Sequence, residues 1–236
     1  MAINKVVCNG ETLMDITSST VTEDSLVYGV TAYDARGEKI TGTLAADSGD
    51  HSKWVADPVN NPLSIPYGTT AIGNELCYLS KGVYSISIPE TLETIGERAF
   101  QDCPNLAGVV NFKNVKNLGN SAFRGCAKIT NILMDGMEVI GPLVFSYCSG
   151  LTNVTLPGTI KNVQTGAFKS CTGLKTVTFE KGESASPING ISADAFVGCS
   201  ALTDIYVYWA YGVAGNAPWN APSGCKIHYT DQTVTV

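Results

Sequence analysis

One nine-residue pattern returns five times in the middle of the chain and constrains the fold more than any other feature. In each copy an aliphatic residue is followed five positions later by Phe and eight positions later by Cys: IGERAFQDC (95–103), LGNSAFRGC (118–126), IGPLVFSYC (140–148), VQTGAFKSC (163–171) and ISADAFVGC (191–199). The Phe residues lie 23, 22, 23 and 28 positions apart: Phe100, Phe123, Phe145, Phe168 and Phe196. A period in the twenties is typical of a solenoid, in which each turn stacks on its neighbour and cannot fold alone.

Further aliphatic positions keep the same period. Three positions after each Cys stand Leu106, Ile129, Leu151, Leu174 and Leu202, and three positions later still stand Val109, Ile132, Val154, Val177 and Ile205. Short segments around the second set alternate apolar and polar residues, which predicts strands. A weaker copy upstream carries Cys77 and Ser80 in the Phe and Cys positions, as the uncovered first turn of a solenoid allows.

The pattern therefore predicts a mainly β fold, a solenoid of about six turns of 22–28 residues spanning 63–207. Residues 180–190, rich in Gly, Ser and Pro, account for the widest spacing and are predicted to form a loop. Residues 45–62 have the composition of a linker, and 208–236 form a predicted aromatic-rich C-terminal cap.

Residues 1–44 predict a small N-terminal α+β module. Thr20 and Glu23 fit a capping box for a short helix that ends near Gly29, and 31–34 with 38–44 fit a hairpin. So short a segment rarely folds alone, so we expect it to dock on another protein or on further copies of the chain, in the second case as a homo-trimer.

Charge and hydropathy exclude several classes of function. Lys and Arg total 15 against 21 Asp and Glu, the net charge is −6, and the basic residues form no cluster. A phosphate-binding surface needs such a cluster, so we expect no nucleic-acid partner and no polybasic attachment to membranes. The sequence has neither a secretory signal core nor an apolar run of about 20 residues, which predicts synthesis in the cytoplasm and no membrane insertion.

The repeats resemble the BspA-type, or Treponema-type, leucine-rich repeat, whose pattern is roughly LxxIxLPxxLxxIGxxAFxxCxxL. SIPETLETIGERAFQDCPNL (87–106) matches it nearly throughout, and VTLPGTIKNVQTGAFKSCTGL (154–174) matches with Val163 and Gln164 in place of Ile-Gly. The third turn departs more, because it lacks Leu-Pro and carries Val144 for Ala. The resemblance implies a leucine-rich repeat array that acts through its surface.

Two flanking segments resemble parts of tail proteins from phages and prophages of Firmicutes. One is residues 6–44, with its ending GVTAYDARGEKITGTL, and the other is VYWAYGVAGNAPWNAPSGCKIHYTD (207–231), where Asn220 stands for the usual Gly. This resemblance implies a component of the virion tail, made in the host cytoplasm, which contacts other tail or baseplate proteins through residues 1–44.

The recurring cysteines admit several interpretations, of which burial is favoured. A disulfide framework needs an oxidising compartment, and zinc ligands usually fall two to four residues apart, whereas no two Cys here are closer than 22. A reactive thiol needs a base, and five equivalent thiols cannot each have one. We therefore expect the five repeat Phe to form the core together with buried free thiols at Cys103, Cys126, Cys148, Cys171 and Cys199; Cys8, Cys77 and Cys225 are left open.

No residues are assigned to catalysis, to a cofactor or to a metal. His51 and His228 are the only His, no G-x-S-x-G or phosphate-binding glycine loop occurs, and the carboxylate pair Glu90 and Glu93 fits a solvated edge. A glycan-cleaving enzyme would need a carboxylate pair in a groove, and only the loop at 180–190 could help to build one. The sequence therefore predicts a protein that is not an enzyme.

Candidate binding residues come from the strand edges and from an aromatic cluster. The outward residues that flank the apolar positions are Asn111, Asn131, Asn153, Lys175 and Asp204. In the cluster, Trp209, Tyr211 and Trp219 either cover the last turn, which is the favoured interpretation, or contact a ligand. The favoured function is a tail-associated receptor-binding protein whose solenoid adheres to a cell-surface protein or glycan; the alternative is an adhesin on the bacterial cell surface.

Overall fold

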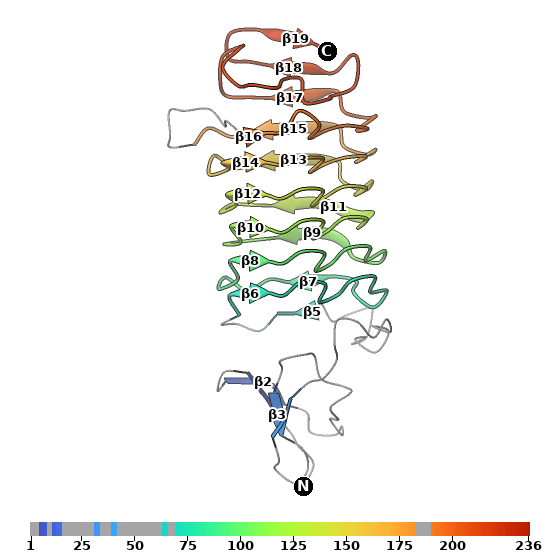
Figure 1. Cartoon of the computed structure of the whole chain (residues 1–236), viewed down its shortest axis with the longest axis vertical. Helices are drawn as coiled ribbons and strands as arrows, with labels where there is room; N and C mark the ends of the chain where they lie inside the picture. The colour runs from blue at the N-terminus through green and yellow to red at the C-terminus, as the bar shows by residue number, and fades with distance from the viewer. Residues whose placement is uncertain are drawn as a thin grey trace.

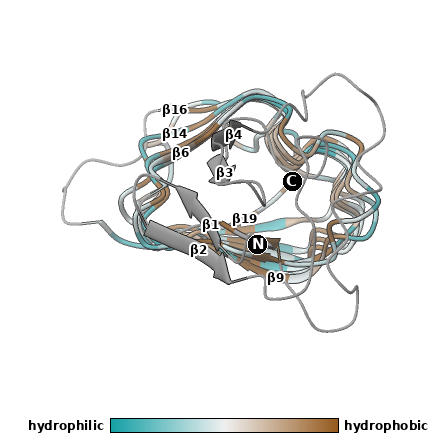
Figure 2. Cartoon of the chain, turned by 90° about the horizontal axis from the view of Figure 1, so that it is seen from below, coloured by the Kyte–Doolittle hydropathy of each residue, from teal (hydrophilic) through white to brown (hydrophobic). Residues whose placement is uncertain are grey.

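The computed structural model shows a stack of β turns (Figure 1). It describes residues 5–8, 11–15, 31–33, 39–41, 63–65, 69–182 and 190–236, with the backbone alone in the four N-terminal ranges. From Leu63 onward the turns follow one another along a single axis, and Figure 2 shows them superimposed when the molecule is viewed along that axis. The predicted mainly β solenoid is confirmed.

One side of the stack carries the longer strands, and we call it the long-strand face. In chain order these strands are β5 (Leu63–Ser64), β7 (Ile86–Ser87), β9 (Ala107–Asn111), β11 (Lys128–Leu133), β13 (Asn153–Leu156), β15 (Thr176–Phe179), β17 (Asp204–Tyr206), β18 (Lys226–His228) and β19 (Thr233–Thr235). They form the pairs β5–β7 and β9–β11 and a five-stranded sheet in the order β13-β15-β17-β18-β19. Pairing is parallel throughout except between β18 and β19, which are antiparallel.

A second side is a parallel sheet of six strands, each only two residues long. Its strands are β6 (Ala71–Ile72), β8 (Thr94–Ile95), β10 (Asn117–Leu118), β12 (Val139–Ile140), β14 (Asn162–Val163) and β16 (Gly190–Ile191). In β8, β10, β14 and β16 the second residue is buried and the first is more exposed, so an aliphatic side chain enters the core at the same place in each turn.

Between the two sides, the repeat Phe and Cys residues lie inside the stack. The rings of Phe100, Phe123, Phe145, Phe168 and Phe196 stack in sequence, with neighbouring centroids 5.1 to 5.9 Å apart. All five rings and the five repeat Cys are fully buried. Burying one such Phe contributes about 1.5–3 kcal/mol, so the repeated ring is one substantial source of stability in each turn.

Two predictions about the array need correction. Val109 keeps the aliphatic period of Ile132 and Val154, but it is 57% exposed and Val110 occupies the buried position instead. The cause is one additional residue between Leu106 and the buried strand position, where Gly108 adopts a φ of +79° and the pairing with β11 changes register. The array also has about seven turns, because the C-terminal segment continues it through β18.

The described N-terminal strands form an antiparallel sheet in the order β2-β1-β3-β4, with β1 at Lys5–Cys8, β2 at Glu11–Asp15, β3 at Thr31–Tyr33 and β4 at Lys39–Thr41. The antiparallel pair β3–β4 is the predicted hairpin, whereas the pair β1–β2 was not predicted. The predicted helix near residues 20–29, the linker and most of the loop at 180–190 lie outside the described residues. Within the described ranges, the chain forms no helix of the length and apolarity that crossing a membrane would require.

Candidate ligand-binding face

The outward side chains of the long-strand face lie in two rows along the stack. Parallel pairing aligns Asn153, Thr176, Asp204 and Lys226 in one row. The repeat places Asn131 before them, and Asn131 pairs in turn with the exposed Val109. The second row contains Thr155, Thr178, Tyr206 and His228, and the repeat places Asn111 and Leu133 before them. We call these two sets the polar rows. Between them, apolar residues such as Val154 and Ile205 point into the core.

Most of the predicted binding residues lie on or beside the polar rows. Asn111 and Asn153 are exposed, Asn131 and Asp204 are half-buried, and Lys175 is exposed just before the first row. Two of the amides already accept hydrogen bonds from backbone N–H groups: Asn111 Oδ1 from Lys113 at 2.9 Å and Asn131 Oδ1 from Ile132 at 2.8 Å. The side chains of these two Asn residues therefore also stabilise the local backbone conformation.

A cluster of polar and aromatic side chains around His228 lies at the C-terminal end of the face. His228 Nε2 lies 2.8 Å from Asp204 Oδ1, and His228 Nδ1 lies 3.3 Å from Thr233 Oγ1. The imidazole also stacks on Tyr206, with the ring centroids 4.3 Å apart. The hydrogen bond from His228 holds the pKa of the Asp204 carboxyl below its usual range. These contacts join β17, β18 and β19, so the cluster ties the last three strands together.

Trp209 and Trp219 were candidates for ligand contact, but both side chains are buried. They pack on Phe179, with ring centroids 5.4 and 5.9 Å away, and the Trp219 indole donates to the carbonyl of Gly215. They cover the apolar end of the array, which supports the interpretation of a cap and removes them from the candidate binding surface. Tyr211 is exposed, and its ring meets the edge of Tyr229.

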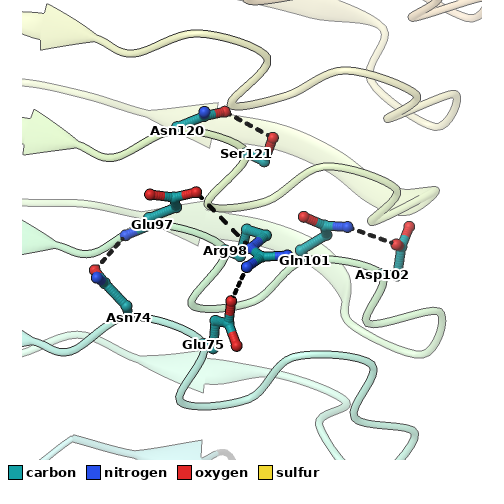
Figure 3. Close-up of polar contacts among 8 residues, drawn as sticks. All are labelled: Asn74, Glu75, Glu97, Arg98, Gln101, Asp102, Asn120 and Ser121. Atoms are coloured by element: carbon teal, nitrogen blue, oxygen red, sulfur yellow. Dashed lines mark hydrogen bonds and ion pairs between the residues drawn. The ribbon is translucent and has the colours of Figure 1, made fainter.

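The sequence did not indicate a second surface, formed by the turns that follow the short strands (Figure 3). Arg98 pairs with Glu75 of the preceding turn and lies over the ring of Tyr78, 5.5 Å from its centroid. One turn later Arg124 lies 3.6 Å from a carboxylate oxygen of Asp102 and 5.3 Å from the centroid of Tyr147. Arg and Tyr are enriched at binding hot spots, but here each Arg is already paired with a carboxylate of the preceding turn.

Opposite charges also alternate along the short-strand side. Lys116 pairs with Glu93 at 3.4 Å and Lys161 with Glu138 at 2.6 Å. The hydrogen bond from Lys161 lowers the pKa of the Glu138 carboxyl. Three of the side chains are exposed and Glu138 is half-buried; such surface pairs contribute little stability, so they fit a solvated edge better than acid–base chemistry.

Among the described residues, no group of three or more His, Cys, Asp or Glu side chains is arranged to hold a metal ion. The seven described Cys are free and buried: Cys77, Cys103, Cys126, Cys148, Cys171, Cys199 and Cys225. Burial raises the pKa of the Cys148 thiol to about 12 and that of Cys225 to about 11. Thiols with a raised pKa are poor nucleophiles and poor metal ligands at neutral pH, whereas the hydrogen bond with Cys171 lowers the pKa of the Cys199 thiol.

A stacked array with polar rows along one face and a covered end defines a solenoid repeat protein, and comparison with known proteins assigns its family. The chain belongs to the BspA-type leucine-rich repeat family, because the model of the BspA type leucine rich repeat region matches residues 70–203, more than half of the chain, in six copies. The crystal structure of a leucine-rich repeat protein from T. pallidum is similar in fold, with a TM-score of 0.54 and 24% identity over 67% of this chain and 77% of that one.

Two further solved structures show weaker similarity. A leucine rich cell surface protein from Faecalibacterium prausnitzii is 20% identical, with a TM-score of 0.44 over 75% of this chain and 37% of that one. A leucine-rich repeat protein from Bacteroides ovatus is 17% identical, with a TM-score of 0.37 over 62% and 55%. A comparison with curated proteins gave no match. The family match ends at residue 203, and none of these matches is to a phage tail protein.

Proposed function

We propose that the protein is a non-enzymatic adhesive protein of the bacterial cell surface and that it binds a surface protein or glycan along its polar rows. The alignment of these rows carries the proposal. Neighbouring strands lie about 4.8 Å apart, so hydroxyl, amide and charged groups recur at that spacing over several turns. A long polar ligand could contact each turn weakly, and the contacts along one molecule would add together.

Binding can be tested by placing a bulky charge on the polar rows. Asn153→Arg changes an exposed residue at the centre of the first row, and Asn117→Arg changes an exposed Asn on the short-strand side as a matched control. The probes are a printed glycan array and immobilised membrane proteins from epithelial cells. We expect Asn153→Arg to weaken binding about tenfold, the equivalent of 1.4 kcal/mol, while Asn117→Arg binds like the unchanged protein. Equal effects of the two substitutions would refute the assignment of the face.

Attachment to a phage tail is a second candidate, favoured only by the resemblance of residues 6–44 and 207–231 to tail proteins. In that case residues 1–44 would contact other tail or baseplate proteins, and the polar rows would bind the receptor on the host cell. The neighbouring genes distinguish the two roles. Sortase or transport genes beside this one would support the surface adhesin, whereas tail and baseplate genes would support the virion component.

A further inference from the structure

The long-strand sheet ends at an edge where β19 has a neighbour on one side only. β19 pairs antiparallel with β18, and among the described strands none pairs with its other side; in Figure 1 it is the last element of the stack. Tyr229 N–H donates to the carbonyl of Gln232 at 2.8 Å, and Val236 N–H donates to the carbonyl of Cys225 at 2.8 Å. Bonded and non-bonded residues alternate along an antiparallel pair, so the N–H and C=O groups of Thr233 and Thr235 point toward the open edge.

Apart from its short length of three residues, this edge lacks the features that usually prevent strand edges from associating. Proteins protect such edges with Lys, Pro, bulges or strands too short to pair. β19 reads Thr-Val-Thr, pairs with β18 without a register shift, and has the same length as β17 and β18. Two N–H groups and two carbonyls are therefore available for another strand.

The segment that leads into β18 is uncharged, and the exposed charged residues next to β19 are Lys226 and Asp231. Residues 207–225 contain no Asp, Glu, Lys, Arg or His, although the chain has 36 Asp, Glu, Lys and Arg residues. Within this segment Tyr211 and Val213 are 55% and 49% exposed, and Tyr211 packs against Tyr229 at the turn that leads into β19. The terminal turn of a solenoid normally has a polar outer face, which keeps it soluble and monomeric. Here an open strand edge and exposed apolar side chains occur together.

We propose that β19 pairs with β19 of a second copy of this chain and joins two solenoids end to end. Thr-Val-Thr reads the same in both directions, so in an antiparallel pair Thr233 lies opposite Thr235 of the second copy and Val234 lies opposite its counterpart. Each strand then bonds both of its outward N–H groups, and no charged residue lies opposite another. Such a contact is isologous, so it closes as a two-fold dimer and does not propagate into a fibre.

Size-exclusion chromatography with light scattering over a series of concentrations tests the dimer on the full chain. Thr235→Pro removes one outward N–H from each copy but none of the bonds to β18, because Thr235 is not bonded to that strand. Two hydrogen bonds per dimer are lost, so we expect the dissociation constant to rise about tenfold while the urea unfolding midpoint of the monomer is unchanged. Thr235→Lys, which leaves the backbone intact, should also weaken the dimer through charge repulsion.

Thr155→Lys is the matched control, since Thr155 is an exposed Thr on β13, at the opposite end of the same sheet, where β11 of the preceding turn lies next to it. It should dimerise like the unchanged chain. A molecular mass of one chain at every concentration would overturn the proposal, as would a dimer insensitive to both Thr235 substitutions. Trimers or open-ended assemblies would overturn it as well, because they require other surfaces, such as residues 1–44.

Discussion

At the scale of single residues, the repeated Cys has a specific structural task. In each regular turn the thiol donates to a backbone carbonyl of the preceding turn: Cys126 to Phe100 at 3.0 Å, Cys148 to Phe123 at 3.2 Å and Cys171 to Phe145 at 3.0 Å. The carbonyls of Phe123 and Phe145 also accept the backbone N–H groups of Cys126 and Cys148, at 3.2 and 3.1 Å, so the thiol of the next turn adds a second, weaker hydrogen bond while it fills space in the core. An aliphatic side chain of the same size could only fill the space.

Burial of these thiols predicts slow chemical modification. The pKa of Cys148 is raised from 9.0 to about 12, so its thiolate is rare even at pH 9, whereas an unfolded thiol is half ionised there. We expect a disulfide reagent to label the five repeat Cys quickly in urea and slowly in buffer at pH 8. The raised pKa also means that burial stabilises the fold below pH 9, and that this contribution declines as pH rises from about 9 toward 12. Rapid labelling of all five in the native protein would contradict the stacked core.

At the scale of the repeat, two positions in most turns adopt a left-handed backbone, and the turn of Phe196 has only the second of them. One lies two residues before the Phe position, at Glu75, Arg98, Ser121, Leu143 and Gly166, and the other lies two residues after it, at Leu79, Asp102, Gly125, Tyr147, Ser170 and Gly198. Their φ values run from +53° to +78°. Residues other than Gly are disfavoured there, and the close spacing of the two bends lets the chain reverse direction around the Phe.

The left-handed position at Ser170 predicts a stabilising substitution. Its φ is +57°, and Gly occupies the equivalent position at Gly125 and Gly198. Replacing Ser170 by Gly relieves about 1–2 kcal/mol of backbone strain and costs about 0.5–1 kcal/mol of unfolded-chain entropy, so we expect a net gain of about 0.5–1 kcal/mol. Ser200→Gly is the control, since Ser200 does not have a positive φ, and it should be neutral or destabilising. Urea unfolding of both variants measures the difference, and a gain from Ser200→Gly alone would contradict the argument.

The sequence predicted these turns well at positions that have a single structural role. Phe and Cys recur because the same core site is repeated in each turn, and their period was sufficient to predict the solenoid fold. Val109 was misplaced because the signal for an added residue was a single Gly108, and the sequence alone does not show whether a Gly forms a bulge or an ordinary strand residue. The polar rows were partly found, since alternation identifies outward residues, but alternation cannot show that Asn131 bonds its own backbone.

At the scale of the whole molecule, the last turn shows where repeat patterns fail. It carries Trp219 and no repeat Phe, yet the Phe196 N–H donates to the Trp219 carbonyl at 3.1 Å, just as earlier Phe residues donate to the next turn. Ile227 follows Ile205 by 22 positions and pairs with it, and that spacing was the available signal. A terminal turn has a neighbour on one side only. Its side chains must pack on the preceding turn and also shield the apolar end of the array from water, so they differ from the repeat pattern.

This dual task makes Trp219 the residue on which the end of the array depends most. Its side chain is fully buried, contacts Phe179 and Trp209, and has its indole N–H bonded, so Trp219→Ala would leave a large cavity above the sixth turn. We expect a loss of about 3–5 kcal/mol in the free energy of unfolding. Tyr211→Ala removes an exposed ring from the same turn and should cost less than about 1 kcal/mol. Urea titrations followed by circular dichroism, at concentrations where the chain is monomeric, compare the two; equal losses would mean that the aromatic residues do not act as a cap.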